Sequence, residues 1–98
     1  MNEQHKAIVG IAWYRPEQWS RLRELSEDAD QLEPDYESWH RNAKTKMTEL
    51  IISGVQVEKV VIDTEALSAW CVQHRSKINA QTRAQFTTHI LREKHEHT

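Results

Sequence analysis

Apolar residues fill both alternating sets of positions between Ala7 and Tyr14, and no charged residue interrupts them. This pattern is typical of a strand that is covered on both faces. The next residues, Arg15-Pro16-Glu17, suit the start of a helix, because Pro is favoured at the first helical position and an acid suits the first turn. We therefore expect a strand from about Lys6 to Tyr14, and then a helix that ends near Ser26.

A second apolar segment, Val55 to Ile62, is rich in β-branched residues and alternates with polar residues in its first part. Its last part is apolar throughout, so we expect its far end to be buried more deeply than its start. Asp63 then offers the side chain of a helix N-cap. The helix that follows should be short and should end near His74 or Arg75.

The longest helix is predicted where apolar side chains recur at steps of three and four, after residues 33–35. The apolar stripe of this helix comprises Tyr36, Trp39, Ala43, Met47, Leu50 and Ile51. Gly54 would end the helix in a left-handed conformation. A last helix is expected to start after Asn79, which can serve as its N-cap, and its apolar positions continue to Leu91. We expect the residues from Arg92 onward to form a frayed polar tail.

The predicted order is β-α-α-β-α-α, an α/β fold with a small two-stranded sheet, parallel in our interpretation, that helices cover. The two halves overlay at an offset of 48 positions, which places Pro16 on Thr64 and Glu17 on Glu65. This overlay suggests a structural pseudo-repeat without demonstrating a duplication. Two strands make a poor sheet alone, so we expect either that dimerisation extends the sheet or that helices cover it tightly.

Length and charge narrow the class of protein. We expect a single domain over residues 1–98, with an ordered core of about 6–92 and polar tails at both ends. The net charge of −2 argues against a general nucleic-acid-binding protein and gives no reason to expect adhesion to anionic membranes. The chain begins without a signal-peptide pattern, and no apolar run reaches the roughly 20 residues that span a bilayer. Together with the single cysteine, Cys71, these features predict a cytoplasmic protein.

Several segments together resemble a known set of sequences. These segments are Ile11 to Trp19, Asp28, Tyr36 to Trp39, Val60 to Asp63 and Ala69 to Cys71. With this spacing, the chain resembles a family of short bacterial proteins that share the segment Ile-Ala-Trp-Tyr-Arg-Pro-Glu and for which no activity is known. The resemblance covers roughly residues 8 to 90. It implies a stand-alone bacterial protein of one domain, and it implies no activity.

The ends of the two strands are the best candidate for a binding site, because ligands bind outside the carboxyl ends of parallel strands. If the strands are neighbours, Tyr14 and Arg15 lie beside Asp63 and Glu65. Arg15 and the N–H groups of the helix starts could then bind an anion, and the two acids could orient a polar group or act as a base. In the plainer alternative, Asp63 is only a helix cap and Arg15 pairs with Asp63 or Glu17.

Other clusters have simpler structural explanations. Six acids lie between Glu27 and Glu37 without a base, but a solvated loop that caps the next helix explains them more simply than a cation site does. His89 and Glu93 have the spacing of a two-ligand metal clip, yet no further fixed ligand joins them. The four Trp residues fall on apolar stripes, so core packing explains them better than stacking on nucleic-acid bases. We expect neither a metal site nor a cofactor.

No complete catalytic constellation is present, since Cys71 lies among apolar neighbours and the histidines lack a partner nucleophile nearby in the sequence. We therefore favour a non-catalytic binding or assembly module that forms a homodimer. A charge on an edge strand, such as Val57→Lys, should then break the dimer. The alternative is a binder of a small anionic ligand, or a minor enzyme, whose site lies at the carboxyl ends of the two strands.

Overall fold

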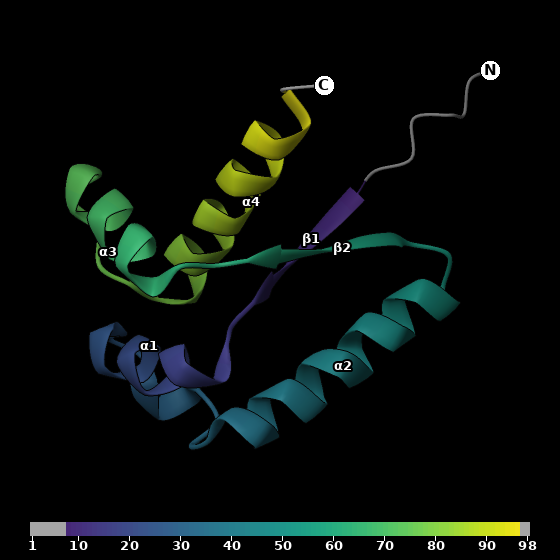
Figure 1. Cartoon of the computed structure of the whole chain (residues 1–98), viewed down its shortest axis with the longest axis horizontal. Helices are drawn as coiled ribbons and strands as arrows, with labels where there is room; N and C mark the ends of the chain where they lie inside the picture. The colour runs from purple at the N-terminus through teal and green to yellow at the C-terminus, as the bar shows by residue number, and fades with distance from the viewer. Residues whose placement is uncertain (1–7, 97–98) are drawn as a thin grey trace.

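The structure, a computed structural model, describes residues 8–96. The elements are β1 (Ile8–Trp13), the 3-10 helix η1 (Pro16–Gln18), α1 (Trp19–Leu25), the 3-10 helix η2 (Ala29–Gln31), α2 (Tyr36–Ile52), β2 (Gln56–Val61), α3 (Thr64–Gln73) and α4 (Ala80–Glu96). The predicted order of strands and helices is confirmed, and the fold is α/β (Figure 1). The expected start of the first strand, at Lys6, lies outside the described residues.

The two strands pair in parallel to form a two-stranded sheet. Ile8 lies opposite Gln56 and Trp13 lies opposite Val61. This register has the same offset of 48 positions that overlays the two halves of the sequence. Each half contributes one strand followed by two α-helices, and the first half also contains the two 3-10 helices.

One long helix lies on each side of the sheet, as Figure 1 shows for α4 and α2. A Cβ atom built at Gly10 would lie 3.1 Å from Cδ2 of Leu91 in α4, so α4 approaches the backbone of β1 closely there. The small residue Gly10 permits this approach. On the other face, the Trp13 ring packs edge-on against Trp39 and His40 of α2.

The expectation that both faces of the first strand are buried is wrong, because no residue of β1 is fully buried, and the only exposed one lies on the face toward α2. On that face Val9 is 38% exposed, and Val61 of the second strand is 52% exposed. The reason is that a single helix crosses this face, and it contributes no fully buried residue of its own. Ile51 and Ile52, at the end of the apolar stripe of α2, are 55% and 80% exposed.

The buried core lies near the carboxyl ends of the strands, where α1, α3 and α4 meet. Its members are Tyr14, Trp19, Leu22, Val60, Ile62, Leu67, Cys71, Ile78 and Phe86. As expected, the second strand is buried most deeply at its far end, through Val60 and Ile62. The core therefore stabilises the region in which β1 and β2 pass into the helices that follow them.

The helix caps follow the prediction. Asp63 accepts hydrogen bonds from two N–H groups at the start of α3, and Asn79 accepts one from the N–H of Thr82 in α4. Gly54 follows α2 with a φ of 93°. The last helix differs from the prediction, because α4 continues to Glu96 instead of fraying from Arg92. None of the helices in residues 8–96 is long and apolar enough to cross a membrane.

Candidate binding groove beside strand β1

The outer edge of β1 presents free backbone hydrogen-bonding groups. The C=O of Trp13 accepts a hydrogen bond from the N–H of Ile62, so Trp13 directs its backbone groups toward β2. Successive residues of a strand direct their backbone groups to opposite edges, and Gly10 and Ala12 therefore direct theirs away from β2. Within residues 8–96, no hydrogen-bond partner faces the N–H and C=O groups of these two residues.

A groove of about 380 Å³ runs along this edge; we call it the β1 groove. Its lining residues are Gly10, Ile11, Ala12 and Tyr14 of the first strand and its end, Ala80, Arg83, Ala84, Thr87 and Thr88 of α4, and Trp19, Leu32 and Trp39. The lining comes from α4 on one face of the sheet and from α2 on the other, so the groove passes around the edge of β1. The strand edge is thus accessible from outside.

The inner end of the β1 groove is aromatic. Tyr14 packs against Trp19 and Trp39, with ring centroids 5.9 Å and 5.3 Å away, and the two tryptophans stack at 5.4 Å. Only 5% of Tyr14 is exposed, yet its hydroxyl has no hydrogen-bond partner in the described part of the chain. Burial raises the pKa of Tyr14 to about 12, so the hydroxyl keeps its proton at neutral pH and can donate it to a ligand.

A paired arginine lies beside the tyrosine. Nη1 and Nη2 of Arg83 donate to the two carboxylate oxygens of Asp28 at 2.8 Å and 2.9 Å, and Nη1 also donates to Oγ of Ser26. Both charged side chains are largely buried, with 11% and 16% exposed. The hydrogen bonds from Arg83 hold the pKa of the Asp28 carboxyl below its usual value. The pair is therefore ionised and neutral overall, and it ties the loop after α1 to α4.

The opposite edge of the sheet differs in chemistry. By the same alternation, Val57, Lys59 and Val61 direct their backbone groups outward from β2. This strand carries Glu58 and Lys59, whereas Ile8–Trp13 contains no charged residue. We call the outer edge of β1 the uncharged edge and that of β2 the charged edge. Glu58 pairs with Lys94 and His95 of α4, and Nζ of Lys59 lies 4.3 Å from the centroid of the Trp13 ring.

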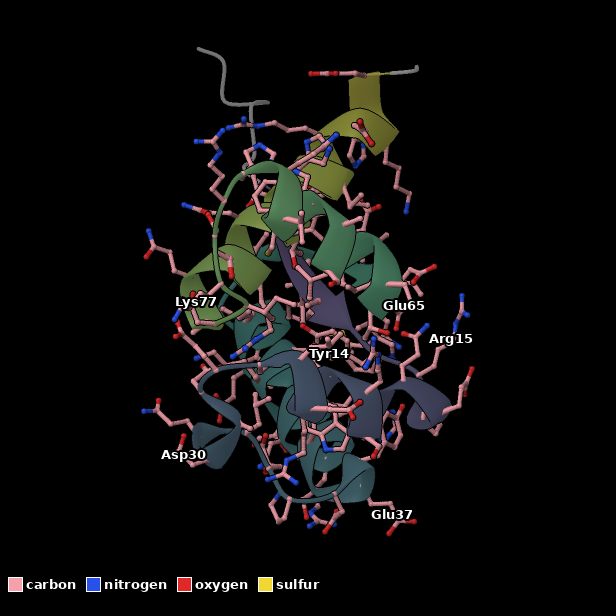
Figure 2. All side chains as sticks on the ribbon, turned by 90° about the vertical axis from the view of Figure 1, so that its left-hand side faces the viewer. Tyr14, Arg15, Asp30, Glu37, Glu65 and Lys77 are labelled. Atoms are coloured by element: carbon pink, nitrogen blue, oxygen red, sulfur yellow. The ribbon has the colours of Figure 1, made fainter. Side chains whose placement is uncertain are left out.

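The four residues proposed from the sequence differ in burial and in the contacts they make. Figure 2 shows Tyr14 near the middle of the molecule, with Arg15 and Glu65 together on one side at its outer boundary. The Arg15 side chain is exposed and forms no hydrogen bond or ion pair with any residue in 8–96. Asp63 serves as the cap of α3, as the plainer alternative held, and Glu65 pairs with Arg21 at 2.8 Å. The expected pairing of Arg15 with an acid is absent from the described residues.

The acidic segment is used in structural contacts. Asp28 pairs with Arg83, Asp35 caps α2, and Glu27 and Glu33 accept hydrogen bonds from Asn79 and Asn42. Its remaining acids, Asp30 and Glu37, are exposed (Figure 2). Within residues 8–96 no three potential ligands are grouped as a metal site would need.

Two further candidates also have structural roles. His89 lies 3.3 Å from Glu93 and contacts the ring of Trp70, so the proposed two-ligand clip is a pair on the surface of α4. Cys71 is a free cysteine in the core, with 1% exposed, which agrees with its expected burial.

Sequence reasoning identified Tyr14 but missed the residues that surround it. Arg83 lies 55 positions from Asp28, and only the folded chain shows that they pair. One signal was present: Arg83 stands four residues before Thr87 and one turn from Ala80, so it falls beside the apolar stripe of its helix. A charged residue at such a position needs a partner.

No family model, curated protein or solved structure matches this chain. The resemblance to short bacterial proteins therefore stays a prediction.

Proposed function

We propose that this protein is a non-catalytic assembly module that forms a homodimer by pairing the uncharged edges of two copies. The observation that carries the proposal is the open backbone of Gly10 and Ala12 beside an accessible groove. An edge strand with free N–H and C=O groups is a template for another strand. Two β1 strands that run antiparallel about a two-fold axis would join two small sheets into one of four strands.

The uncharged edge is complementary to itself. Because Ile8–Trp13 carries no charge, two copies meet there without repulsion between like charges. A pairing centred on Gly10 brings the two glycines together at the two-fold axis, where neither has a side chain that would obstruct the other copy. The charged edge lacks this property, because it would bring together like charges at Glu58 and Lys59.

The helix beside the groove supports the same arrangement. Ala80, Ala84 and Thr88 of α4 recur at steps of four, are exposed, and line the groove. Since α4 lies over β1, antiparallel pairing of two β1 strands would place the α4 helices of both copies on the same face of the joined sheet. Small side chains permit a close approach of two helices.

Exposed apolar surface on the opposite face adds to this argument. Val9 lies on β1 itself and is 38% exposed. Pairing at the uncharged edge would place the strand of a second copy beside Val9 and reduce the exposure of its side chain to water. The energetic gain per residue is modest, at about 25 cal/mol for each Å² of apolar surface buried. An assembly role is also consistent with the engagement of Asp63 and Glu65 in a cap and an ion pair, which leaves neither free to act as a base.

The test is the mass in solution, measured by light scattering from about 1 to about 100 µM, where dimers of micromolar affinity dissociate. The wild-type chain is expected to approach twice its monomer mass of 11.6 kDa at the upper end of this range. Val9→Lys should hold the chain at the monomer mass, because the ammonium would have to be desolvated beside a second β1 strand. The side chain of Val9 is partly exposed, so the monomer should stay folded, as circular dichroism would show.

The matched control is Val57→Lys, since Val57 lies directly opposite Val9 in the register and belongs to the charged edge. This variant should dimerise like the wild type. We therefore expect the disruptive position on β1, whereas the sequence suggested Val57 on β2. A wild-type chain that is monomeric at the highest concentration would overturn the proposal, and so would dissociation caused equally by both substitutions.

We also propose that this module acts in the bacterial cytoplasm. A bacterial cytoplasm would suit the buried free thiol of Cys71, which stays reduced there.

A further inference from the structure

We infer that the inner end of the β1 groove is a binding site for a small, flat, uncharged molecule that carries a hydrogen-bond acceptor such as an amide or ketone carbonyl. Three observations carry this inference: the unpartnered hydroxyl of Tyr14, the stacked indoles beside it, and the internal neutralisation of Arg83 by Asp28.

The Tyr14 hydroxyl is the polar anchor of this site. Only 5% of the side chain is exposed, but its hydroxyl is not one of the fully buried polar atoms that lack a partner, so it keeps contact with solvent. Tyr14 lines the groove, and its hydroxyl has no hydrogen-bond partner among residues 8–96. A ligand carbonyl would accept a hydrogen bond from this donor in place of water.

The walls of the inner end favour a flat apolar body. Trp19, Trp39 and Leu32 line the groove there, and the indole N–H of Trp19 is already bonded to the C=O of Glu33. Trp19 is only 3% exposed and is stacked on Trp39, so the apolar surface open to a ligand is that of the partly buried Trp39 and Leu32. A flat ring can pack against this surface in an offset or edge-on contact. The groove volume of about 380 Å³ lies within the range of small-molecule sites.

The ion pair between Arg83 and Asp28 favours a neutral ligand over the anion that the sequence suggested. An anion would have to compete with the Asp28 carboxylate for the guanidinium of Arg83, at contacts of 2.8 Å and 2.9 Å. It would also lie close to the charge of Asp28 itself. A neutral acceptor avoids both costs, because it takes a hydrogen bond from Tyr14 and leaves the ion pair intact.

The site and the proposed dimer use different parts of the groove. Strand pairing would use the backbone groups of Gly10 and Ala12, whereas the ligand end is formed by Tyr14 and the side chains around it. The inference therefore stands independently of the dimer. The monomeric variant Val9→Lys retains every residue that lines the ligand end.

The experiment is an NMR titration of the full chain with benzamide and, in parallel, with benzoate, which has the same shape and a full negative charge. Benzamide is expected to shift the indole N–H signals of Trp19 and Trp39 with a Kd in the millimolar range, as suits a molecule of this size. Benzoate should bind at least about tenfold more weakly.

Tyr14→Phe keeps the ring and removes the hydroxyl, so it should weaken benzamide binding about tenfold. The matched control is Tyr36→Phe, because Tyr36 contacts the same tryptophans but does not line the groove. The control should bind benzamide like the wild type. Val9→Lys should also bind benzamide with unchanged affinity.

Three results would overturn the inference. Equal or tighter binding of benzoate would show that Arg83 leaves Asp28 for a ligand anion. Unchanged affinity in Tyr14→Phe would remove the proposed anchor, provided that this variant keeps the wild-type spectrum in its remaining signals. Loss of binding in Val9→Lys alone would assign the site to the interface between two chains.

Discussion

The two outer edges of the sheet have the same backbone geometry but opposite side-chain chemistry. Both strands are six residues long, and each leaves alternate backbone groups without a partner in residues 8–96. The edge of β2 carries Glu58 and Lys59, which are engaged by α4 and by the Trp13 ring. The edge of β1 carries no charge and opens onto a groove.

This difference indicates which edge is available to a partner. Natural sheets protect their edges with charges, especially Lys, because an unprotected edge pairs with other chains. When one edge is protected and the other is open, two chains can pair once and the association stops. If both edges were open, chain after chain could add to a continuous sheet. Substitutions on each edge test whether this difference in charge controls stability and association.

The largest effect is expected from Gly10→Val on the uncharged edge. A Cβ atom added at Gly10 would lie 3.1 Å from Cδ2 of Leu91 and 3.2 Å from Cγ2 of Val60, and the two methyl groups of Val would force α4 away from β1. The free energy of unfolding should fall by about 3 kcal/mol. Urea unfolding at one protein concentration measures this loss. Gln56→Val on the charged edge is the control and should change the stability by less than about 0.5 kcal/mol. A loss below about 1 kcal/mol in Gly10→Val would mean that α4 is not held against the strand.

The next effect concerns the ion pair that borders the groove. Asp28→Asn removes the carboxylate that Arg83 contacts and should cost about 2 kcal/mol at neutral pH. The paired carboxyl has a pKa below its ordinary value of 3.8, so its contribution is present above that pH and is lost as the pH falls through and below it.

The stability difference between wild type and Asp28→Asn should therefore shrink between pH 5 and pH 2, as urea unfolding at each pH would measure. Asp30→Asn, an exposed acid of the same loop, should show almost no difference at any pH. A constant difference across this range would show that Asp28 acts through packing and not through its charge.

A smaller effect is expected in hydrogen exchange. In a dimer formed through the uncharged edge, the N–H groups of Gly10 and Ala12 should exchange at least about tenfold more slowly than in monomeric Val9→Lys. The N–H groups of Lys59 and Val61 on the charged edge should exchange at the same rate in both. NMR on amide signals after transfer to D₂O measures these rates. Fast exchange at Gly10 in the wild type would contradict pairing at this edge.

The smallest effect is expected for Glu58→Gln on the charged edge. Glu58 pairs with Lys94 and His95 near the exposed end of α4, and exposed ion pairs contribute little to stability. Urea unfolding should give a midpoint close to that of the wild type. Only the last turn of α4 should respond, with faster amide exchange. A clear loss of global stability would show that the charged edge is a structural contact and more than a barrier to association.

Local signals in the sequence were sufficient for the elements of this fold. Pro16, Asp63 and Asn79 mark helix starts through chemistry that acts within three or four residues, and the structure places helices after each of them. Burial was harder, because the apolar pattern of Val9 and Val61 does not reveal that one helix covers their face incompletely. How much surface a helix covers depends on packing between distant segments.

The candidate site, too, could be predicted only where the signal in the sequence is local. Tyr14 was identified because it ends a strand, but its charged neighbour is Arg83 and not the adjacent Arg15. The sequence contains 13 Lys and Arg residues, and no local pattern decides which of them reaches Tyr14. The open edge of β1 depends on which residues direct their backbone groups toward β2, and the register alone settles this.

The parallel register also has a consequence for the timing of folding. Because Ile8 pairs with Gln56, the ribosome must add 48 residues after each position of β1 before its partner in β2 exists. At about 5 to 20 residues per second, this takes about 2 to 10 s. During that interval both edges of an uncharged strand lack a partner strand. The growing chain is therefore expected to be most prone to aggregation before β2 leaves the exit tunnel, a period in which binding by a chaperone would matter most.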